Sequence, residues 1–233
     1  MKRVNIVSGL IVFCLSLAVV LLGVFGTGVE MTFQWPSLLL LAVAGLLLWF
    51  SKDRALEPRV SMPCVLSTLL LFGYVVWRAF QTVPAYHARL DICLIGSCLL
   101  VYGLTVSMGL RLRAVLLTLV CLVATIGGFV GVYHYSKDPL WHILPGYLRT
   151  YDEPRAGGFF NNPNHFAGYL EIVLPFAVSL LFVGKGKPWV KVCLAYVSIF
   201  LTVVLLLTNS RGGTLGLVVG YGVLAFLIGF VMI

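Results

Sequence analysis

Long apolar runs separated by short polar segments make up most of this chain. A helix needs about 20 mostly apolar residues to cross a bilayer. Eight segments reach or approach that length: residues 4–25, 35–50, 62–77, 92–110, 114–133, 166–183, 189–208 and 214–233. The pattern predicts an all-α fold, a polytopic bundle of about eight transmembrane helices. We expect one transmembrane domain over residues 1–233, with its longest polar loop at about 135–163.

The composition supports a membrane protein. Hydrophobic residues make up 61% of the 233 residues and charged residues only 10%, whereas soluble domains are about one quarter charged. The net charge of +8 is explained by basic residues in loops, and no nucleic-acid-binding motif accompanies it. The six cysteines lie in apolar stretches without metal-ligand spacing. We therefore predict no nucleic acid partner, no metal and no cofactor.

The distribution of Lys and Arg predicts the orientation. If the N-terminus is cytoplasmic, ten of the 16 basic residues fall in inner segments and six in outer ones, as the positive-inside rule requires. The ten are Lys2, Arg3, Lys52, Arg54, Arg59, Arg111, Arg113, Lys185, Lys187 and Lys191. Two polar islands, residues 155–171 and 209–213, then face the outer side.

The first island reads as the start of a helix. Asn162 is suited to cap it, and Pro163 to occupy the first helical position, where no N–H is needed. Asn164 and His165 would then lie in the first turn. A helix N-terminus carries free N–H groups and a partial positive charge, and Arg155 adds a full charge nearby. The island therefore suits an anion.

The second island repeats this arrangement. Asn209 or Ser210 can cap the last helix, with Arg211 in its first turn. Two arginines and two helix N-termini at one membrane face would suit a diphosphate, so we predict that the islands form one site. Glycines at four-residue spacing favour close helix packing; they are Gly212, Gly216 and Gly220.

One acidic side chain lies clearly inside an apolar segment. Glu171 follows Asn164 by about two turns on the same helix face. A carboxylate inside a membrane is costly unless it is paired or functional. The sequence leaves both readings open, a structural role or a place in the site.

Simpler interpretations exist for the other polar residues as well. Arg155 and Arg211 can extend to the interface without binding a ligand. The asparagines of the first island can serve only as turn and cap residues, and His165 can be an interfacial hydrogen-bonding group. Residues alone therefore indicate a polytopic membrane protein with an outward-facing anion site.

The two islands together resemble a known family. Arg155, followed by Gly-Phe-Phe-Asn-Asn-Pro-Asn-His-Phe-Ala-Gly-Tyr-Leu and later by Asn-Ser-Arg-Gly-Gly at 209–213, is similar to the pattern of the O-antigen ligase family. That bacterial superfamily also contains O-antigen polymerases and protein O-oligosaccharyltransferases. The resemblance covers roughly residues 151–220 and does not separate these activities.

The resemblance implies a metal-independent glycosyltransferase in the bacterial inner membrane with its site facing the periplasm. Such enzymes move a glycan from a polyprenyl (undecaprenyl) diphosphate donor to lipid A-core, a glycan or a protein hydroxyl. Family arginines that hold the diphosphate match Arg155 and Arg211, which we expect to be catalytic. The residues expected to bind substrate are Asn161, Asn164, His165, Glu171 and Ser210.

Two other interpretations stay open. Relatives of the superfamily have been assigned to bicarbonate uptake, so a transporter for a small anion is one alternative. The other is an inactive truncated membrane protein. Family members carry a large periplasmic loop with a histidine beyond the second island, and this sequence ends at Ile233; His165 belongs to the first motif and is not expected to replace that histidine.

Overall fold

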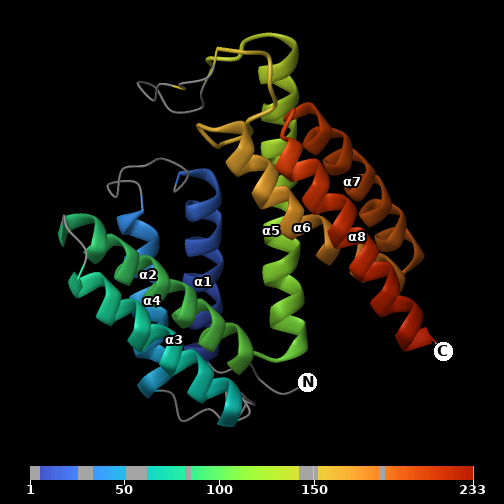
Figure 1. The fold of residues 1–233 in the computed structure, drawn as a ribbon. Coiled ribbons are helices and arrows are strands. Elements are labelled where there is room, and N and C mark those ends of the chain that lie inside the picture. The colour runs from blue at the N-terminus through green and yellow to red at the C-terminus, as the bar shows by residue number, and fades with distance from the viewer. Residues whose placement is uncertain are drawn as a thin grey trace. The chain divides into compact units, whose positions relative to one another are not determined.

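The computed structural model describes residues 6–25, 34–50, 62–81, 85–141, 149, 152–183 and 187–232. In these ranges it contains helices and no strand (Figure 1), which confirms the predicted all-α class. The helices are α1 (Ile6–Val24), α2 (Trp35–Phe50), α3 (Met62–Gln81), α4 (Ala85–Ser107), α5 (Leu110–Ser136), α6 (Pro163–Val183), α7 (Pro188–Leu207) and α8 (Arg211–Met232).

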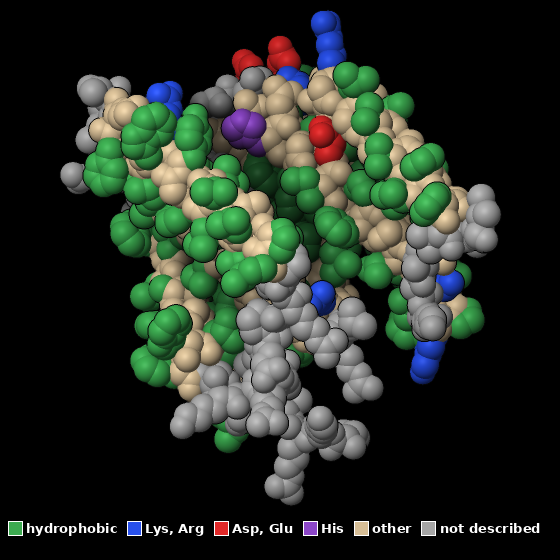
Figure 2. All heavy atoms as spheres, turned by 60° about the horizontal axis from the view of Figure 1, so that its bottom comes forward, with side chains coloured by type: hydrophobic (Ala, Val, Ile, Leu, Met, Phe, Trp, Pro, Cys, Tyr) green, Lys and Arg blue, Asp and Glu red, His purple; other side chains and the backbone are tan. Residues whose placement is uncertain are grey.

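Six of the described helices are long and apolar enough to cross a membrane, and two shorter apolar stretches are Trp35–Phe50 and, within α4, Ile92–Ser107. Apolar side chains predominate on the outward faces of the described helices, and charged ones are few (Figure 2). These features are those of a helical membrane protein. The number of membrane crossings and the orientation of the N-terminus stay predictions.

The helices extend beyond several of the predicted apolar segments. Helix α4 begins at Ala85 and α5 at Leu110, earlier than the predicted positions 92 and 114. The break between them is a sharp turn that Arg113 stabilises: its Nε donates to the Met108 carbonyl (2.9 Å) and its Nη2 to the Val106 carbonyl (2.8 Å). These bonds satisfy carbonyls that a helix end leaves without partners.

The chain divides into two compact units, which are described separately. The first comprises Met1–Val19 and Gln34–Leu116, and in it α4 packs against both α2 and α3. The second comprises Val20–Phe33 and Leu117–Ile233. The second unit contains both polar islands and therefore positions the candidate site. The single transmembrane domain expected over residues 1–233 stays a prediction.

Helix α6 is the centre of the second unit and packs against both α7 and α8 (Figure 1). Its buried residues recur at helical spacing on one side, and α7 contributes a matching set. Between apolar helices in a membrane, close van der Waals packing stabilises such contacts. The buried set is Phe166, Leu170, Val173, Leu174 and Ala177 of α6 with Leu201, Val204 and Leu205 of α7.

Glycines on α5 allow the neighbouring backbone to approach closely. A Cβ on Gly128 would lie 2.7 Å from the Phe200 ring of α7, too close for a real contact. A Cβ on Gly131 would lie 3.3 Å from both the Ala156 Cβ and the Gly158 nitrogen. The segment that carries Arg155 therefore rests directly on α5.

Candidate functional site

The first polar island enters the protein as a buried loop. Residues 156–159 are all buried, and the Ala156 N–H donates to the Leu207 carbonyl at the end of α7 (3.0 Å). Gly158 has a φ of 56°, in the left-handed region that glycine tolerates best. A Cβ on Gly158 would also lie 2.7 Å from the buried ring of Phe166. This loop is therefore fixed against α7 and α6.

The predicted start of α6 is confirmed. The helix begins at Pro163, and the Asn162 side-chain oxygen accepts a hydrogen bond from the Asn164 N–H (2.9 Å). Asn162 is thus the N-cap and Pro163 the first helical residue. The Asn164 side chain lies in the first turn of α6 and is exposed.

Arg155 links the two islands. Its Nε donates to the Thr208 carbonyl at the end of α7 (2.7 Å), and its Nη2 donates to the Asn164 side-chain oxygen (2.8 Å). The side chain is half-buried. Arg155 is therefore held by the protein on two sides, which a side chain that merely reaches for the interface would not require.

The second island contains a tight turn and a cap. Asn209 has a φ of 51°, a conformation that asparagine tolerates better than most residues. The Ser210 hydroxyl then accepts a hydrogen bond from the Gly213 N–H (3.2 Å) and so caps α8. Of the two cap candidates in the sequence, Ser210 caps and Asn209 makes the turn.

The beginning of α8 keeps donors available. The first backbone bond within α8 runs from the Thr214 N–H to the Ser210 carbonyl (2.9 Å). The N–H groups of Arg211 and Gly212 precede it and have no acceptor inside the helix. A Cβ on Gly212 would have nothing within 4 Å, so there is open space beside these donors.

The glycines of α8 make room for Glu171. The glycines that face α6 are Gly213, Gly216 and Gly220, whose added Cβ atoms would meet Ala167, Glu171 and Pro175. The predicted stripe was wrong at its first member, because Gly212 faces open space and Gly213 takes its place. A Cβ on Gly216 would lie 2.7 Å from the carboxyl carbon of Glu171. The carboxylate therefore lies directly against the α8 backbone.

The two islands line one groove with a volume of about 760 Å³. It contains the guanidinium groups of Arg155 and Arg211 and the carboxylate of Glu171. Two basic residues and one acidic residue line it, and the start of α8 adds the positive end of its dipole. The full lining is Arg155, Asn164, Glu171, Asn209, Ser210, Arg211, Gly212 and Gly213.

The groove brings together five of the seven residues that the sequence nominated: Arg155, Asn164, Glu171, Ser210 and Arg211. Asn161 and His165 are not among the residues that line it. His165 is exposed and Asn161 is half-buried with an interaction of its own.

Sequence reasoning gave the remaining lining residues no individual place among the nominated site residues. Asn209, Gly212 and Gly213 belong to the second island itself, so their position beside Arg211 was the available signal. The Thr208 carbonyl, which accepts from Arg155, carried no side-chain signal.

Another arginine, Arg149, packs against the loop that carries Arg155. The buried Arg149 side chain donates from Nη1 to the Pro139 carbonyl (2.5 Å), and a Cβ on Gly157 would collide with its guanidinium group. Burial lowers the pKa of Arg149, and the nearby Asp138 carboxylate opposes that change. Because an arginine pKa starts so high, the group keeps its charge at neutral pH.

Comparisons with protein-family models, with curated proteins and with solved structures find no match to this chain. The resemblance to the O-antigen ligase family therefore stays a prediction.

The groove is suited to an anion with several oxygens. Arg211 is exposed on the first turn of α8, beside two backbone N–H groups without acceptors in the helix. Charge-assisted hydrogen bonds from such donors are stronger than neutral ones. Glu171 adds an acceptor in the same groove, which suits hydroxyl groups rather than phosphate oxygens.

Proposed function

We propose that this protein transfers a glycan from a polyprenyl diphosphate donor to an acceptor hydroxyl. The observation that carries the proposal is the single groove in which Arg155, Arg211 and Glu171 meet beside the start of α8. The groove lies at the beginning of two apolar helices, where the head group of a membrane lipid would lie. The motifs that line it are those that resemble the O-antigen ligase family.

In this reaction the acceptor oxygen bonds to the anomeric carbon of the donor sugar, and the bond from that carbon to the diphosphate breaks. The proton of the acceptor hydroxyl passes to water, and the polyprenyl diphosphate leaves with the bonding electrons. Negative charge therefore grows on the diphosphate. The guanidinium groups of Arg155 and Arg211 and the N–H groups that begin α8 would stabilise that charge.

The other groove residues have supporting roles in the proposal. Asn164 positions Arg155 through the Oδ1 bond, and Ser210 fixes the first turn of α8. Glu171 would accept hydrogen bonds from sugar or acceptor hydroxyls, since an ionised carboxylate only accepts. Under this proposal the site faces the periplasm of a bacterial inner membrane, and the acceptor is lipid A-core, a glycan or a protein.

The test is donor binding and transfer by arginine variants of the full protein in lipid nanodiscs. Arg211→Ala removes charge-assisted bonds, so we expect donor affinity to fall about tenfold to a hundredfold, with transfer reduced at least as much. Arg211→Lys should recover part of the binding, because a point charge remains. Arg155→Lys should recover less, because lysine cannot reproduce both bonds of that side chain.

Lys137→Ala is the matched control, because it removes one exposed positive charge that lies outside the groove. It should leave binding and transfer unchanged. Normal glycan transfer by both Arg155→Ala and Arg211→Ala would overturn the proposal. Uptake of a small anion such as bicarbonate into proteoliposomes, without transfer, would instead identify the groove as part of a transporter.

A further inference from the structure

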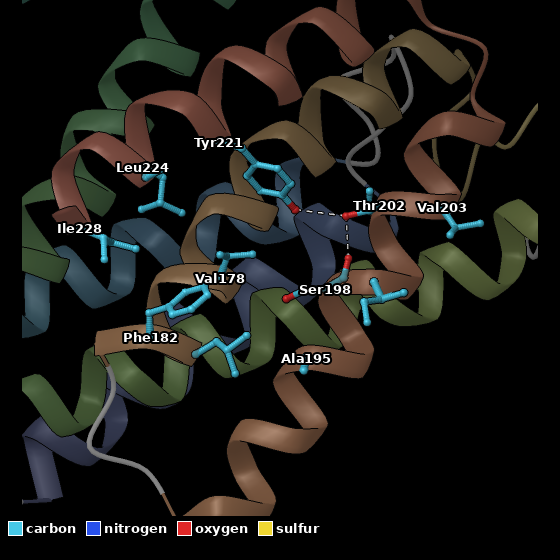
Figure 3. Close-up of a pocket in the computed structure, with 12 residues that line it drawn as sticks. Val178, Phe182, Ala195, Ser198, Thr202, Val203, Tyr221, Leu224 and Ile228 are labelled. Atoms are coloured by element: carbon cyan, nitrogen blue, oxygen red, sulfur yellow. Dashed lines mark hydrogen bonds between the residues drawn. The ribbon is translucent and has the colours of Figure 1, made fainter.

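A second cavity lies between α6, α7 and α8, apart from the groove. It has a volume of about 450 Å³, in the range of pockets that bind small apolar ligands. In Figure 3 the side chains of Val178 and Phe182 from α6, Ala195 from α7, and Leu224 and Ile228 from α8 surround it. Its walls are therefore almost entirely apolar.

One end of the cavity is closed by a hydrogen bond between two helices. The Thr202 Oγ1 of α7 and the Tyr221 hydroxyl of α8 are 3.1 Å apart (Figure 3). The other end extends along α7 to Ala195. The lining of α7 from Ala195 to Val203 corresponds to about 12 Å of helix, so the cavity is long enough for a stretch of hydrocarbon chain.

The cavity is open toward the surroundings of the apolar helices. Phe182 is 62% exposed and Ile199 is 65% exposed, although both line it. Ser198, by contrast, is buried, and its hydroxyl has no hydrogen-bond partner within the described structure. A chain entering from the bilayer would fill space that the protein leaves empty.

Positive charge lies at the end of α7 next to the cavity. Lys191 precedes Ala195 by one turn, and the same helix face continues through Ser198 and Thr202. Lys187 occupies the N-cap position of α7, where its carbonyl accepts a hydrogen bond from the Val190 N–H (2.9 Å). The sequence contains no Asp or Glu from residue 172 to residue 233, so no acidic side chain of that region neutralises the two lysines.

We propose that this cavity binds an acyl chain of an anionic phospholipid, with the lipid phosphate held by Lys191 and Lys187. The two lysines favour an anionic head group over a zwitterionic one, because basic residues next to a membrane attract anionic lipids. Helix α7 is about 30 Å long, and the two lysines lie at its start whereas the groove lies beyond its end. The inference is independent of the glycan-transfer proposal, since it uses none of the groove residues.

The test is lipid binding measured by native mass spectrometry on the purified full protein. Phosphatidylglycerol and phosphatidylcholine with identical acyl chains are the two probes. We expect the wild type to keep phosphatidylglycerol in preference to phosphatidylcholine. Lys191→Gln should reduce that preference about fivefold and leave phosphatidylcholine binding unchanged. Lys137→Gln, which removes a charge far from α7 in the sequence, should change neither.

A second pair of variants tests the cavity itself. Ala225→Phe fills the cavity from an exposed position on α8, and it should weaken retention of both lipids about tenfold. Val192→Phe adds the same ring to an exposed position of α7 that does not line the cavity, and it should have no effect. Thermal unfolding of each variant shows that it is folded, and Ala225→Leu offers a smaller change if the ring is not tolerated.

Three results would overturn the inference. The first is equal retention of the two lipids by the wild type. The second is unchanged retention in folded Ala225→Phe and Ala225→Leu. The third is a lipid-free dimer in which Ala225→Phe disrupts association, which would show that a second copy of the chain covers the cavity.

Discussion

At the scale of single residues, Arg155 has two kinds of partner. Its Nε bond to the Thr208 carbonyl holds the loop to α7, and its Nη2 bond to Asn164 reaches the first turn of α6. Lysine has one compact charge and cannot make both bonds in this planar arrangement. The effect of Arg155→Ala on binding would therefore combine the loss of a charge with displacement of the loop. Arg211 is exposed, so the effect of Arg211→Ala should come from the loss of charge.

The sequence predicted which residues begin α6, but it did not predict which residue forms the turn before α8. Asn162 and Pro163 follow strong positional preferences at helix starts, so the start of α6 could be predicted. The sequence left Asn209 and Ser210 as equal candidates, because both residue types cap helices. The left-handed backbone at Asn209 and the bond from the Gly213 N–H to the Ser210 hydroxyl separate their roles, and both depend on how the chain turns between α7 and α8.

Gly158 offers a test of the loop at the residue scale. Gly158→Ala places a Cβ in a left-handed backbone, which costs about 1–2 kcal/mol, and forces it against Phe166. We expect a lower Tm in detergent. Gly168→Ala is the matched control on α6, where a Cβ would meet nothing within 4 Å; it should keep or raise the Tm, because alanine favours a helix by roughly 1 kcal/mol. A Gly158→Ala protein as stable as the wild type would contradict the close contact with Phe166.

At the scale of helices, apolar run length predicted where each helix exists, and it predicted both ends of α2 but not those of α4 and α5. Hydropathy marks only the part of a helix that is apolar, whereas hydrogen bonding continues the helix into polar residues. Helix α4 illustrates this, because it begins at Ala85 while the apolar run begins near residue 92. The turn before α5 depends on the side chain of Arg113, which no hydropathy pattern represents.

The glycine stripe shows a second limit. Four-residue spacing in one helix selected Gly212, Gly216 and Gly220, but the helix face in contact with α6 contains Gly213 in place of Gly212. Positions separated by three and by four residues both lie on one side of a helix. Which of them faces a neighbour depends on the crossing of the two helices, and that crossing is not encoded in either helix alone.

Alanine at two α8 glycines tests the packing of α6 on α8. Gly216→Ala would push a Cβ into the Glu171 carboxylate. Because the end of this side chain can move aside, we expect a stability loss of about 1 kcal/mol, the low end for overpacked contacts. Gly212→Ala has open space around it and should be tolerated. The measurement is the thermal unfolding midpoint of each purified variant.

A double variant then identifies the colliding group. Glu171→Ala combined with Gly216→Ala should recover much of the stability lost in Gly216→Ala, since the carboxylate is gone. Additive losses would show that Glu171 does not occupy the space beside Gly216.

At the scale of the whole molecule, the sequence predicted the membrane class because composition alone distinguishes it. Few charges and many apolar residues exclude an ordinary soluble domain. Orientation has a different origin, since it depends on how basic loops interact with the membrane during insertion. Helix packing within the second unit is the same in either orientation, so orientation needs its own measurement.

Cysteine labelling measures the orientation directly. In a variant without the native cysteines, Asp152→Cys places an exposed thiol beside the first island, and Lys187→Cys places one at the opposite end of α7. We expect a membrane-impermeant maleimide to label Asp152→Cys in intact cells and Lys187→Cys only after permeabilisation. The reverse result would place the groove on the cytoplasmic side.

The contact between Glu171 and Gly216 also has a consequence for sequence evolution. The carboxylate occupies the volume in which any larger residue at position 216 would place its Cβ. A substitution at 216 therefore requires the Glu171 side chain to move aside or to become smaller, so glycine at 216 favours a carboxylate at 171 in its present place. The two positions should co-vary, so the residue at position 216 on α8 should predict whether related sequences have a carboxylate at position 171 on α6.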